Sequence, residues 1–250
     1  LDDKEEIAKL FSRYDMLSLP VVDKEERLVG IITIDDAVDV MQEANTEDFE
    51  MMAGIAHSDD TYLKMPVVSL AKNRIIWLLV LMFSAMITGA MLEHYEAAIA
   101  TLPLLVSFIP MLMDTGGNCG SQASTMIIRG MALDEIEPSD FLRVWWKEIR
   151  VALLCGGTLS VVNFVRIYLQ YNVLAAEPNP DCVRIAAVVS LTLIATVCIA
   201  KSLGCILPML AKKLKLDPAL MAAPMITTVT DACSILVFFS LALTILRDRL

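Results

Sequence analysis

Long apolar runs, separated by short polar stretches, occupy the sequence from about residue 75 to its C-terminal end. A membrane-spanning helix needs about 20 consecutive apolar residues. Five runs reach that length, at about residues 75–93, 98–127, 145–170, 184–210 and 218–246. The pattern therefore predicts an all-α polytopic membrane protein with five transmembrane helices.

The segment before these runs is charged and follows another pattern. Residues 21–22 predict a short strand, residues 24–27 a turn and residues 28–34 a second strand. Residues 35–44 open on two aspartates and predict a helix, because acidic residues favour a helix N-terminus. This unit is too small for a core of its own. It resembles the second half of a CBS motif, a module that pairs with another copy and often senses adenine nucleotides or ions.

Composition indicates a membrane protein that handles cations rather than nucleic acid. The hydrophobic fraction is 56% and the mean hydropathy is +0.62, too apolar for an ordinary soluble domain. The net charge of −10 argues against nucleic-acid binding, which needs a basic surface. The six cysteines form no CxxC pair and are interpreted as small buried apolar residues.

Most basic residues that flank the apolar runs lie on one side, which predicts the orientation of the chain. The loops at residues 93–96 and 175–181 hold no lysine or arginine, whereas the alternate connections are basic. By the positive-inside rule the N-terminus is cytosolic and the C-terminus lies outside. Arg184, Arg247 and Arg249 are exceptions to this rule.

An acidic stripe follows the predicted soluble helix, which continues to about residue 55. Asp39, Glu43 and Glu47 are spaced by four residues and share one helix face. Like charges at this spacing destabilise a helix by a few tenths of a kcal/mol each, so something positive should offset them. The stripe is either a solvated acidic face or a divalent-cation site.

The last apolar run contains a single acidic residue within its length and a proline near its start. Asp231 is the only ionisable residue between Asp217 and Arg247, and an acid at membrane depth usually marks an ion pathway. Pro224 lacks an N–H, so we expect the helix to open locally and to expose carbonyl oxygens. A structural acid, protonated or paired with another helix, is the alternative.

Residues 223, 227 and 231 fall on one face of this predicted helix. Ala223, Thr227 and Asp231 therefore align oxygen atoms along any pore that the face lines. Oxygen-only ligands suit hard cations such as Mg²⁺.

The second apolar run contains the polar stretch "DTGGNCGSQAS" at residues 114–124. Its glycines permit either a break in the helix or a close approach of another backbone. The candidate residues that line a pathway are Asp114, Gly117, Asn118, Gln122 and, on the last run, Pro224. A helix-packing seam of small residues with polar contacts is the alternative.

Together, "PMLMDTGGNCGSQASTMIIRGMAL" (110–133) and "LDPALMAAPMITTVTD" (216–231) resemble the MgtE family of magnesium channels. The resemblance implies the end of a second CBS motif at 1–40, a connecting plug helix and linker at 41–68, and a pore domain at 69–250. It implies a homodimer in a lipid bilayer, with one pore on the two-fold axis. The sequence holds no first CBS motif and no N-terminal helical domain, so we expect it to be part of a longer protein. Nucleotide regulation would belong to a full CBS module.

The resemblance also implies where Mg²⁺ binds. Asp231 would hold an ion that keeps most of its waters, with the carbonyls of Thr227 and Ala223 touching that hydrated ion. Cytosolic Mg²⁺ would bind between the plug helices, the CBS domains and the start of the fifth helix, and would close the gate. The residues that match these regulatory acids are Asp217, Asp39, Glu43, Glu47 and Asp48. Thr227 departs from the small apolar residue that the family often has there, and Asp114 has no assigned role.

Three other interpretations remain open at this point. The first is a transporter for Mn²⁺, Co²⁺ or Ca²⁺, or a carrier coupled to H⁺ or Na⁺, since oxygen ligands do not exclude these ions. The second is an intramembrane aspartyl protease that uses Asp114 and Asp231 as a carboxylate pair, although neither lies in a GxGD setting. The third is a sensory membrane anchor, which would carry no ion flux and would tolerate Asp231→Ala.

Overall fold

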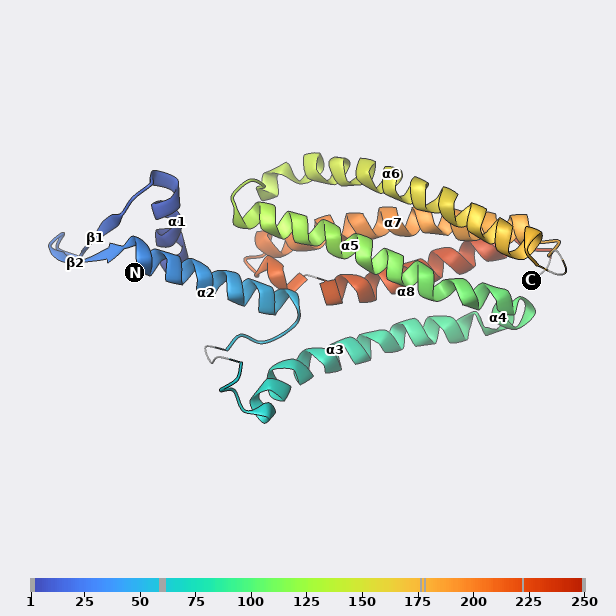
Figure 1. Ribbon diagram of the computed structural model, residues 1–250, viewed down its shortest axis with the longest axis horizontal. Helices are drawn as coiled ribbons and strands as arrows, with labels where there is room; N and C mark the ends of the chain where they lie inside the picture. Colours follow the sequence, from blue (N-terminus) through green and yellow to red (C-terminus); the bar gives the residue numbers. More distant parts are fainter. Residues whose placement is uncertain (1–2, 59–61, 176, 178, 222, 249–250) are drawn as a thin grey trace. The chain divides into compact units, whose positions relative to one another are not determined.

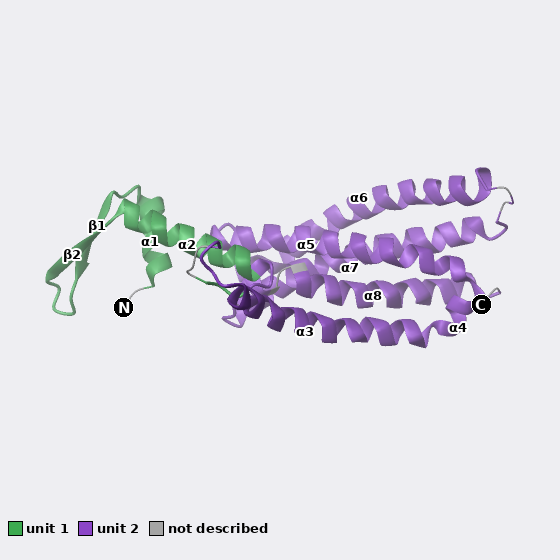
Figure 2. Cartoon of the chain, turned by 60° about the horizontal axis from the view of Figure 1, so that its bottom comes forward, with its two compact units in different colours: residues 1–51, 56–59 green, residues 52–55, 60–250 purple. Residues whose placement is uncertain are grey.

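The computed structural model describes residues 3–58, 62–175, 177, 179–221 and 223–248. These residues form two compact units, which are coloured separately in Figure 2. Unit 1 comprises residues 1–51 and 56–59, and unit 2 comprises residues 52–55 and 60–250. Each unit is described by itself below.

Unit 1 is a small α/β unit built on an antiparallel hairpin (Figure 1). Its elements are α1 (Lys4–Tyr14), β1 (Ser18–Val22), β2 (Leu28–Thr33) and α2 (Ile34–Met52). The predicted strands, turn and helix are all present. Helix α1 is additional, and its Ala8 and Phe11 are buried against Ala37 of α2 to make the core. The small size of that core fits a unit that is half of a paired module.

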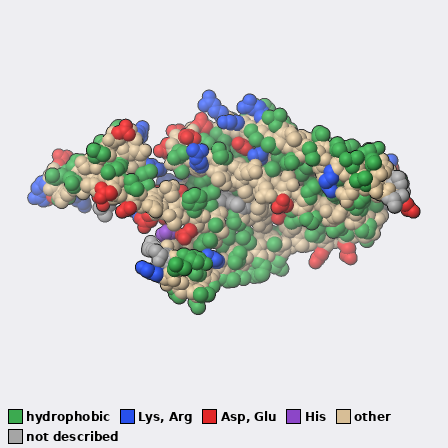
Figure 3. Space-filling view, in the orientation of Figure 1, with side chains coloured by type: hydrophobic (Ala, Val, Ile, Leu, Met, Phe, Trp, Pro, Cys, Tyr) green, Lys and Arg blue, Asp and Glu red, His purple; other side chains and the backbone are tan. Residues whose placement is uncertain are grey.

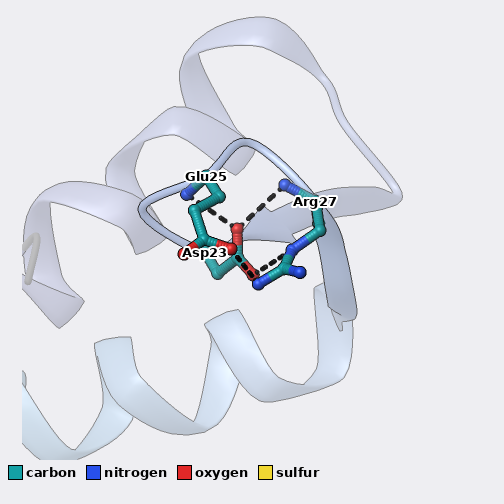
Figure 4. A network of polar contacts seen from close by, with 3 residues as sticks. All are labelled: Asp23, Glu25 and Arg27. Atoms are coloured by element: carbon teal, nitrogen blue, oxygen red, sulfur yellow. Dashed lines mark hydrogen bonds and ion pairs between the residues drawn. The ribbon is translucent and has the colours of Figure 1, made fainter.

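Asp23 holds the turn between the strands in shape (Figure 4). Its Oδ1 accepts hydrogen bonds from the backbone N–H groups of Glu25 (2.9 Å) and Arg27 (3.0 Å), and its Oδ2 accepts one from Arg27 Nε (2.9 Å). Arg27 also forms an ion pair with Glu25. The backbone hydrogen bond from Arg27 is the main cause that lowers the pKa of the Asp23 carboxyl. The turn is therefore organised by an acceptor that favours its charged form.

Asp36 fixes the start of α2 in the same way. Its Oδ2 accepts hydrogen bonds from the backbone N–H (2.9 Å) and the hydroxyl (2.7 Å) of Thr33, the residue before the helix. The backbone bond is the main cause that lowers the pKa of Asp36 below its ordinary value. From this start α2 runs without interruption to Met52, so the predicted soluble helix is confirmed.

The Asp36 contact predicts a pH-dependent helix start. Because the pKa of Asp36 is lowered in the folded state, its stabilisation is complete above the ordinary carboxyl pKa and is lost as the pH falls through the lowered value. Asp36→Ala should remove it at neutral pH and increase hydrogen exchange of the Thr33 amide roughly fivefold. Asp35→Ala, in the same turn, is the control. Equal exchange in both variants would contradict this assignment.

Unit 2 is a bundle of long helices (Figures 1 and 2). Its α-helices are α3 (Val67–His94), α4 (Glu96–Thr101), α5 (Ile109–Ala132), α6 (Phe141–Tyr168), α7 (Cys182–Lys213) and α8 (Ala223–Ile245). Short 3₁₀ or π segments cover Pro103–Phe108, Pro138–Asp140, Leu169–Val173 and Pro218–Met221. Helix α7 packs against α5, α6 and α8, whereas α3 contacts α8. The largest core cluster includes Leu105, Phe108, Leu112, Phe238 and Phe239, all nearly inaccessible.

Four helical segments of the described chain are long and apolar enough to cross a membrane. They are Val67–His94, Pro138–Val173, Cys182–Lys213 and Pro224–Ile245. Figure 3 shows hydrophobic side chains spread widely over the visible surface of the protein. In α3, for example, Ile76, Phe83 and Met86 are more than half exposed. A surface this apolar suits contact with lipid.

The second predicted span, residues 98–127, is wrong as a single helix. The structure divides this stretch into α4, a 3₁₀ segment that starts at Pro103, and α5, which starts at Ile109. Proline removes a helical hydrogen bond and so ends or begins helices. Helix α5 has 24 residues but is not among the four apolar segments, because polar residues interrupt it.

Candidate functional site

Helix α5 has one polar, exposed side and one buried side made of small residues. Asp114, Asn118 and Gln122 are exposed and follow one another at intervals of four residues. Gly116, Gly120 and Ala123 are buried on the other side. The two interpretations of the sequence motif, a pathway wall and a packing seam, therefore apply to different faces of the same helix.

The glycines of α5 allow neighbouring helices to approach closely, and they do not break the helix. A Cβ at Gly116 would lie 2.7 Å from the methyl carbons of both Thr196 and Thr230, and one at Gly120 would lie 3.2 Å from the carbonyl oxygen of Ala200. Helix α5 is continuous from Ile109 to Ala132, so the possible break at these glycines is wrong. The missing side chains let α5 sit directly against α7 and α8.

Gly117 lies at the contact between α5 and α8. It is buried, and a Cβ there would lie 2.7 Å from Cγ2 of Thr227. Of the residues expected to line a pathway, Gly117 is thus covered by Thr227, whereas Asp114, Asn118 and Gln122 are open on the surface of the protomer.

Pro224 is the second residue of α8, and Pro218–Met221 before it form a separate 3₁₀ segment. Regular α-helix is thus absent one turn before Pro224, as expected, but α8 itself does not open at Pro224. Proline fits there without distortion, since the first N–H groups of a helix have no helical partner. The carbonyl oxygen of Pro224 accepts hydrogen bonds from the hydroxyls of Thr227 (2.8 Å) and Thr228 (3.1 Å). The Thr227 hydroxyl is therefore engaged within its own helix.

The position of Ala223 and Thr227 in α8 decides how their backbone carbonyl oxygens could contact an ion. Ala223 is the first residue of α8, so Ala223, Thr227 and Asp231 occupy one face of a continuous helix. A helical carbonyl keeps one lone pair after it accepts its helical bond. The carbonyls of Ala223 and Thr227 could therefore contact the water shell of an ion, but they are not freed by unwinding.

The structure brings together two acids that are far apart in the sequence. Asp231 is partly exposed on α8, and the carboxylate of Asp114 on α5 lies close enough for its negative charge to act on it. Among the described residues no three acidic, histidine or cysteine side chains converge to form a metal cage. Two carboxylates suit a cation that keeps most of its water, because few direct ligands are then needed.

Asp217 makes a structural contact shortly before α8 begins. Its Oδ1 accepts a hydrogen bond from the backbone N–H of Ala219 (2.7 Å), in the short helix Pro218–Met221. A metal bound there would use the remaining oxygen lone pairs.

In unit 1, Asp39, Glu43 and Glu47 share one face of α2, as predicted from their spacing, and Asp48 lies one residue further along the helix. The expected positive group is Lys4 of α1, whose Nζ lies 2.8 Å from Glu43 Oε2. This hydrogen bond lowers the pKa of Glu43 and raises that of Lys4, which also interacts with Glu47. Sequence reasoning missed Lys4 because α1 was not predicted.

Comparison with known proteins identifies the family of the chain. Residues 109–241 match the MgtE family, described as divalent cation transporters, and residues 2–43 match the CBS domain. The chain belongs to the MgtE family. The matched region contains both the polar face of α5 and Asp231.

Three magnesium transporters named MgtE are similar to this member of the MgtE family. The protein from Thermus thermophilus is 36% identical over 240 residues, which are 96% of this chain and 51% of the relative. The Bacillus subtilis protein is 35% identical over 243 residues, 97% of this chain and 51% of the relative. The Enterococcus faecalis protein is 29% identical over 248 residues, 98% of this chain and 52% of the relative. The chain thus spans about half the length of these relatives.

Membership of the MgtE family decides between some of the earlier interpretations. The family consists of transporters, not enzymes, which removes the basis for a protease that uses Asp114 and Asp231. It also supports a membrane protein, in agreement with the four apolar helical segments of the described chain.

Proposed function

We propose that the chain is the membrane part of a magnesium channel that carries Mg²⁺ into the cell down its electrochemical gradient. The observation that carries this proposal is the exposed polar face of α5 beside Asp231 on α8, in a member of a divalent cation transporter family. The similar magnesium transporters favour Mg²⁺ among divalent cations.

The polar face implies a second copy of the chain. Asp114, Asn118 and Gln122 would be costly in contact with lipid. In a homodimer with the two-fold axis along this face, they would instead line a water-filled pore. Each copy would contribute one Asp231, and the carbonyls of Thr227 and Ala223 would contact the water shell of the ion. Such a site selects a hydrated octahedral ion without removing its water.

The proposed orientation is that of the positive-inside rule, with the N-terminus in the cytosol and the C-terminus outside a multi-pass cell membrane. A membrane potential contributes roughly 2.3 kcal/mol per elementary charge for each 100 mV. A divalent ion gains twice that on entry, so influx needs no coupled ion.

Cytosolic Mg²⁺ would close this channel by binding to Asp39, Glu43, Glu47 and Asp48 of α2 together with Asp217. In low Mg²⁺ these carboxylates would repel one another, and Lys4 would compensate only part of the charge. Each ion that binds only the closed state adds RT ln(1+[L]/Kd) to its stability, so several weak sites give a steep response. The exposed apolar side chains of β2, including Leu28 and Ile31, suit pairing with another CBS motif, where a nucleotide could bind.

The test is a current measurement on the full-length protein in excised patches, with stepped cytosolic Mg²⁺. We expect Mg²⁺ current at low cytosolic Mg²⁺ and closure at millimolar concentrations. Mg²⁺ movement that occurs only with a sodium or proton gradient would instead identify a coupled carrier. A larger current with Mn²⁺, Co²⁺ or Ca²⁺ than with Mg²⁺ would reassign the transported ion.

A further inference from the structure

An ion pair is buried inside unit 2, away from the proposed pore face. Lys201 Nζ of α7 lies 3.5 Å from Glu148 Oε2 of α6, and only 6% and 15% of the two side chains are exposed. It is the most buried ion pair that the structure describes. Both residues lie inside apolar helical segments that can span a membrane.

A buried ion pair of this kind contributes little to the stability of the fold. Removing two charges from water costs several kcal/mol per ion, and a buried pair can often be replaced by apolar residues without loss. Ionisable residues at membrane depth are instead usually functional. The position of Lys201 relative to α5 indicates which function it could serve.

Lys201 lies at the point where α7 supports α5. Its neighbour Ala200 faces Gly120, since a Cβ at Gly120 would lie 3.2 Å from the Ala200 carbonyl oxygen. One turn later, a Cβ at Gly204 would lie 2.4 Å from the Gly120 carbonyl oxygen. The positive charge of Lys201 also acts on Cys119 of α5, which directly follows Asn118 of the polar face.

A second polar contact joins α6 to α7 at the same level. Trp145 Nε1 donates a hydrogen bond to Ser202 Oγ (3.2 Å), three residues before Glu148 and one residue after Lys201. Glu148 and Trp145 together therefore fix the segment of α7 against which α5 packs. They also place a negative charge beside a buried lysine whose charge acts on α5.

We propose that Glu148 and Lys201 are positioning residues for ion transport, an inference that rests on the proposed function. The pair holds α7 against α6 and neutralises a positive charge next to α5. Without Glu148, an unpaired ammonium group would lie behind the polar face of α5 and would repel a cation at Asn118. Without Lys201, an unpaired carboxylate would have the opposite effect, reduced because a lone buried acid can take up a proton.

The test measures Mg²⁺ uptake by the full-length protein in liposomes, as maximal rate and half-saturating concentration. Glu148→Gln should raise the half-saturating concentration about tenfold, and Lys201→Met should lower it by less. The neutral double variant Glu148→Gln/Lys201→Met should return within about threefold of wild type. Lys213→Met removes an exposed charge from the end of the same helix and is the control.

The direction in which the half-saturating concentration changes shows whether the pair positions the ion pathway or only stabilises helix packing. A merely structural pair would lower the amount of folded protein and the maximal rate in both single variants, and would leave the half-saturating concentration unchanged. That outcome, or a double variant as impaired as Glu148→Gln, would overturn the proposal. If Glu148→Gln does not fold, Lys201→Met decides: a lowered half-saturating concentration supports the proposal, and an unchanged one overturns it. Absence of uptake by the wild type contradicts the proposed function itself, and this inference with it.

Discussion

Replacing Asp231 by asparagine is expected to lower Mg²⁺ conductance at least ~100-fold while the protein still folds. A charge pair about 4 Å apart in a protein environment interacts with ~4 kcal/mol, and each ~1.4 kcal/mol corresponds to a factor of ten. The estimate is reduced for a hydrated ion, whose waters hold it further from the carboxylate. Asparagine keeps the shape and one oxygen, so a loss would report the charge itself.

The measurement compares single-channel or macroscopic Mg²⁺ currents at low cytosolic Mg²⁺, with protein amounts matched. Glu93→Gln removes one carboxylate at the exposed end of α3 and should conduct like the wild type. Asp114→Asn should reduce conductance less than Asp231→Asn, because Asp114 is the more exposed of the two acids. Wild-type currents in Asp231→Asn would remove Asp231 from the pathway.

Replacing Gly204 by alanine is expected to destabilise unit 2 by about 2 kcal/mol. The added Cβ would lie 2.4 Å from the Gly120 carbonyl oxygen and 3.1 Å from the Ser124 nitrogen. These are backbone atoms, so a side-chain rotation cannot relieve the overlap and α5 must move away from α7. The steric cost exceeds the gain in helix propensity, which is about 1 kcal/mol for alanine over glycine.

Gly157 is the matched control, since it also lies in a helix but a Cβ there meets nothing within 4 Å. Gly157→Ala should therefore be neutral or slightly stabilising. Thermal unfolding of both variants in detergent, followed with size-exclusion chromatography, makes the comparison. Equal unfolding temperatures would show that α5 and α7 can separate at Gly204 without loss.

Local patterns were enough to predict most elements. Apolar runs located four of the long helices of unit 2, short apolar stretches on either side of a turn located β1 and β2, and two aspartates located the start of α2. Two elements were misjudged for local reasons. Helix α1 is short and charged, and only its burial against Ala37 reveals its role. Residues 98–127 were joined into one helix because their apolar composition masked the effect of Pro103.

The candidate site was only partly predictable. The residue types at Asp231 and in the motif around Asn118 indicate cation binding whatever the fold, because polar groups at membrane depth are costly and are usually functional. Which residues of that motif are open and which are packed depends on helix rotation. Only the contacts of Gly116 and Gly120 with α7 and α8 show that this face of α5 is buried. Asp114, Asn118 and Gln122 lie on the opposite, exposed face.

The sequence by itself therefore determined that this is an α-helical membrane protein with a CBS-like segment and oxygen-rich positions suited to a hard cation. The tertiary structure decided which charged groups interact: Lys4 pairs with Glu43 and Lys201 with Glu148, and Asp114 lies near enough to Asp231 for its charge to act on it. The physical reason is the range of the forces involved. Hydrophobic periodicity and turn preferences act over a few residues and are written locally in the sequence. Electrostatic pairs and close helix contacts join residues far apart along the chain, and these appear only when the helices have packed.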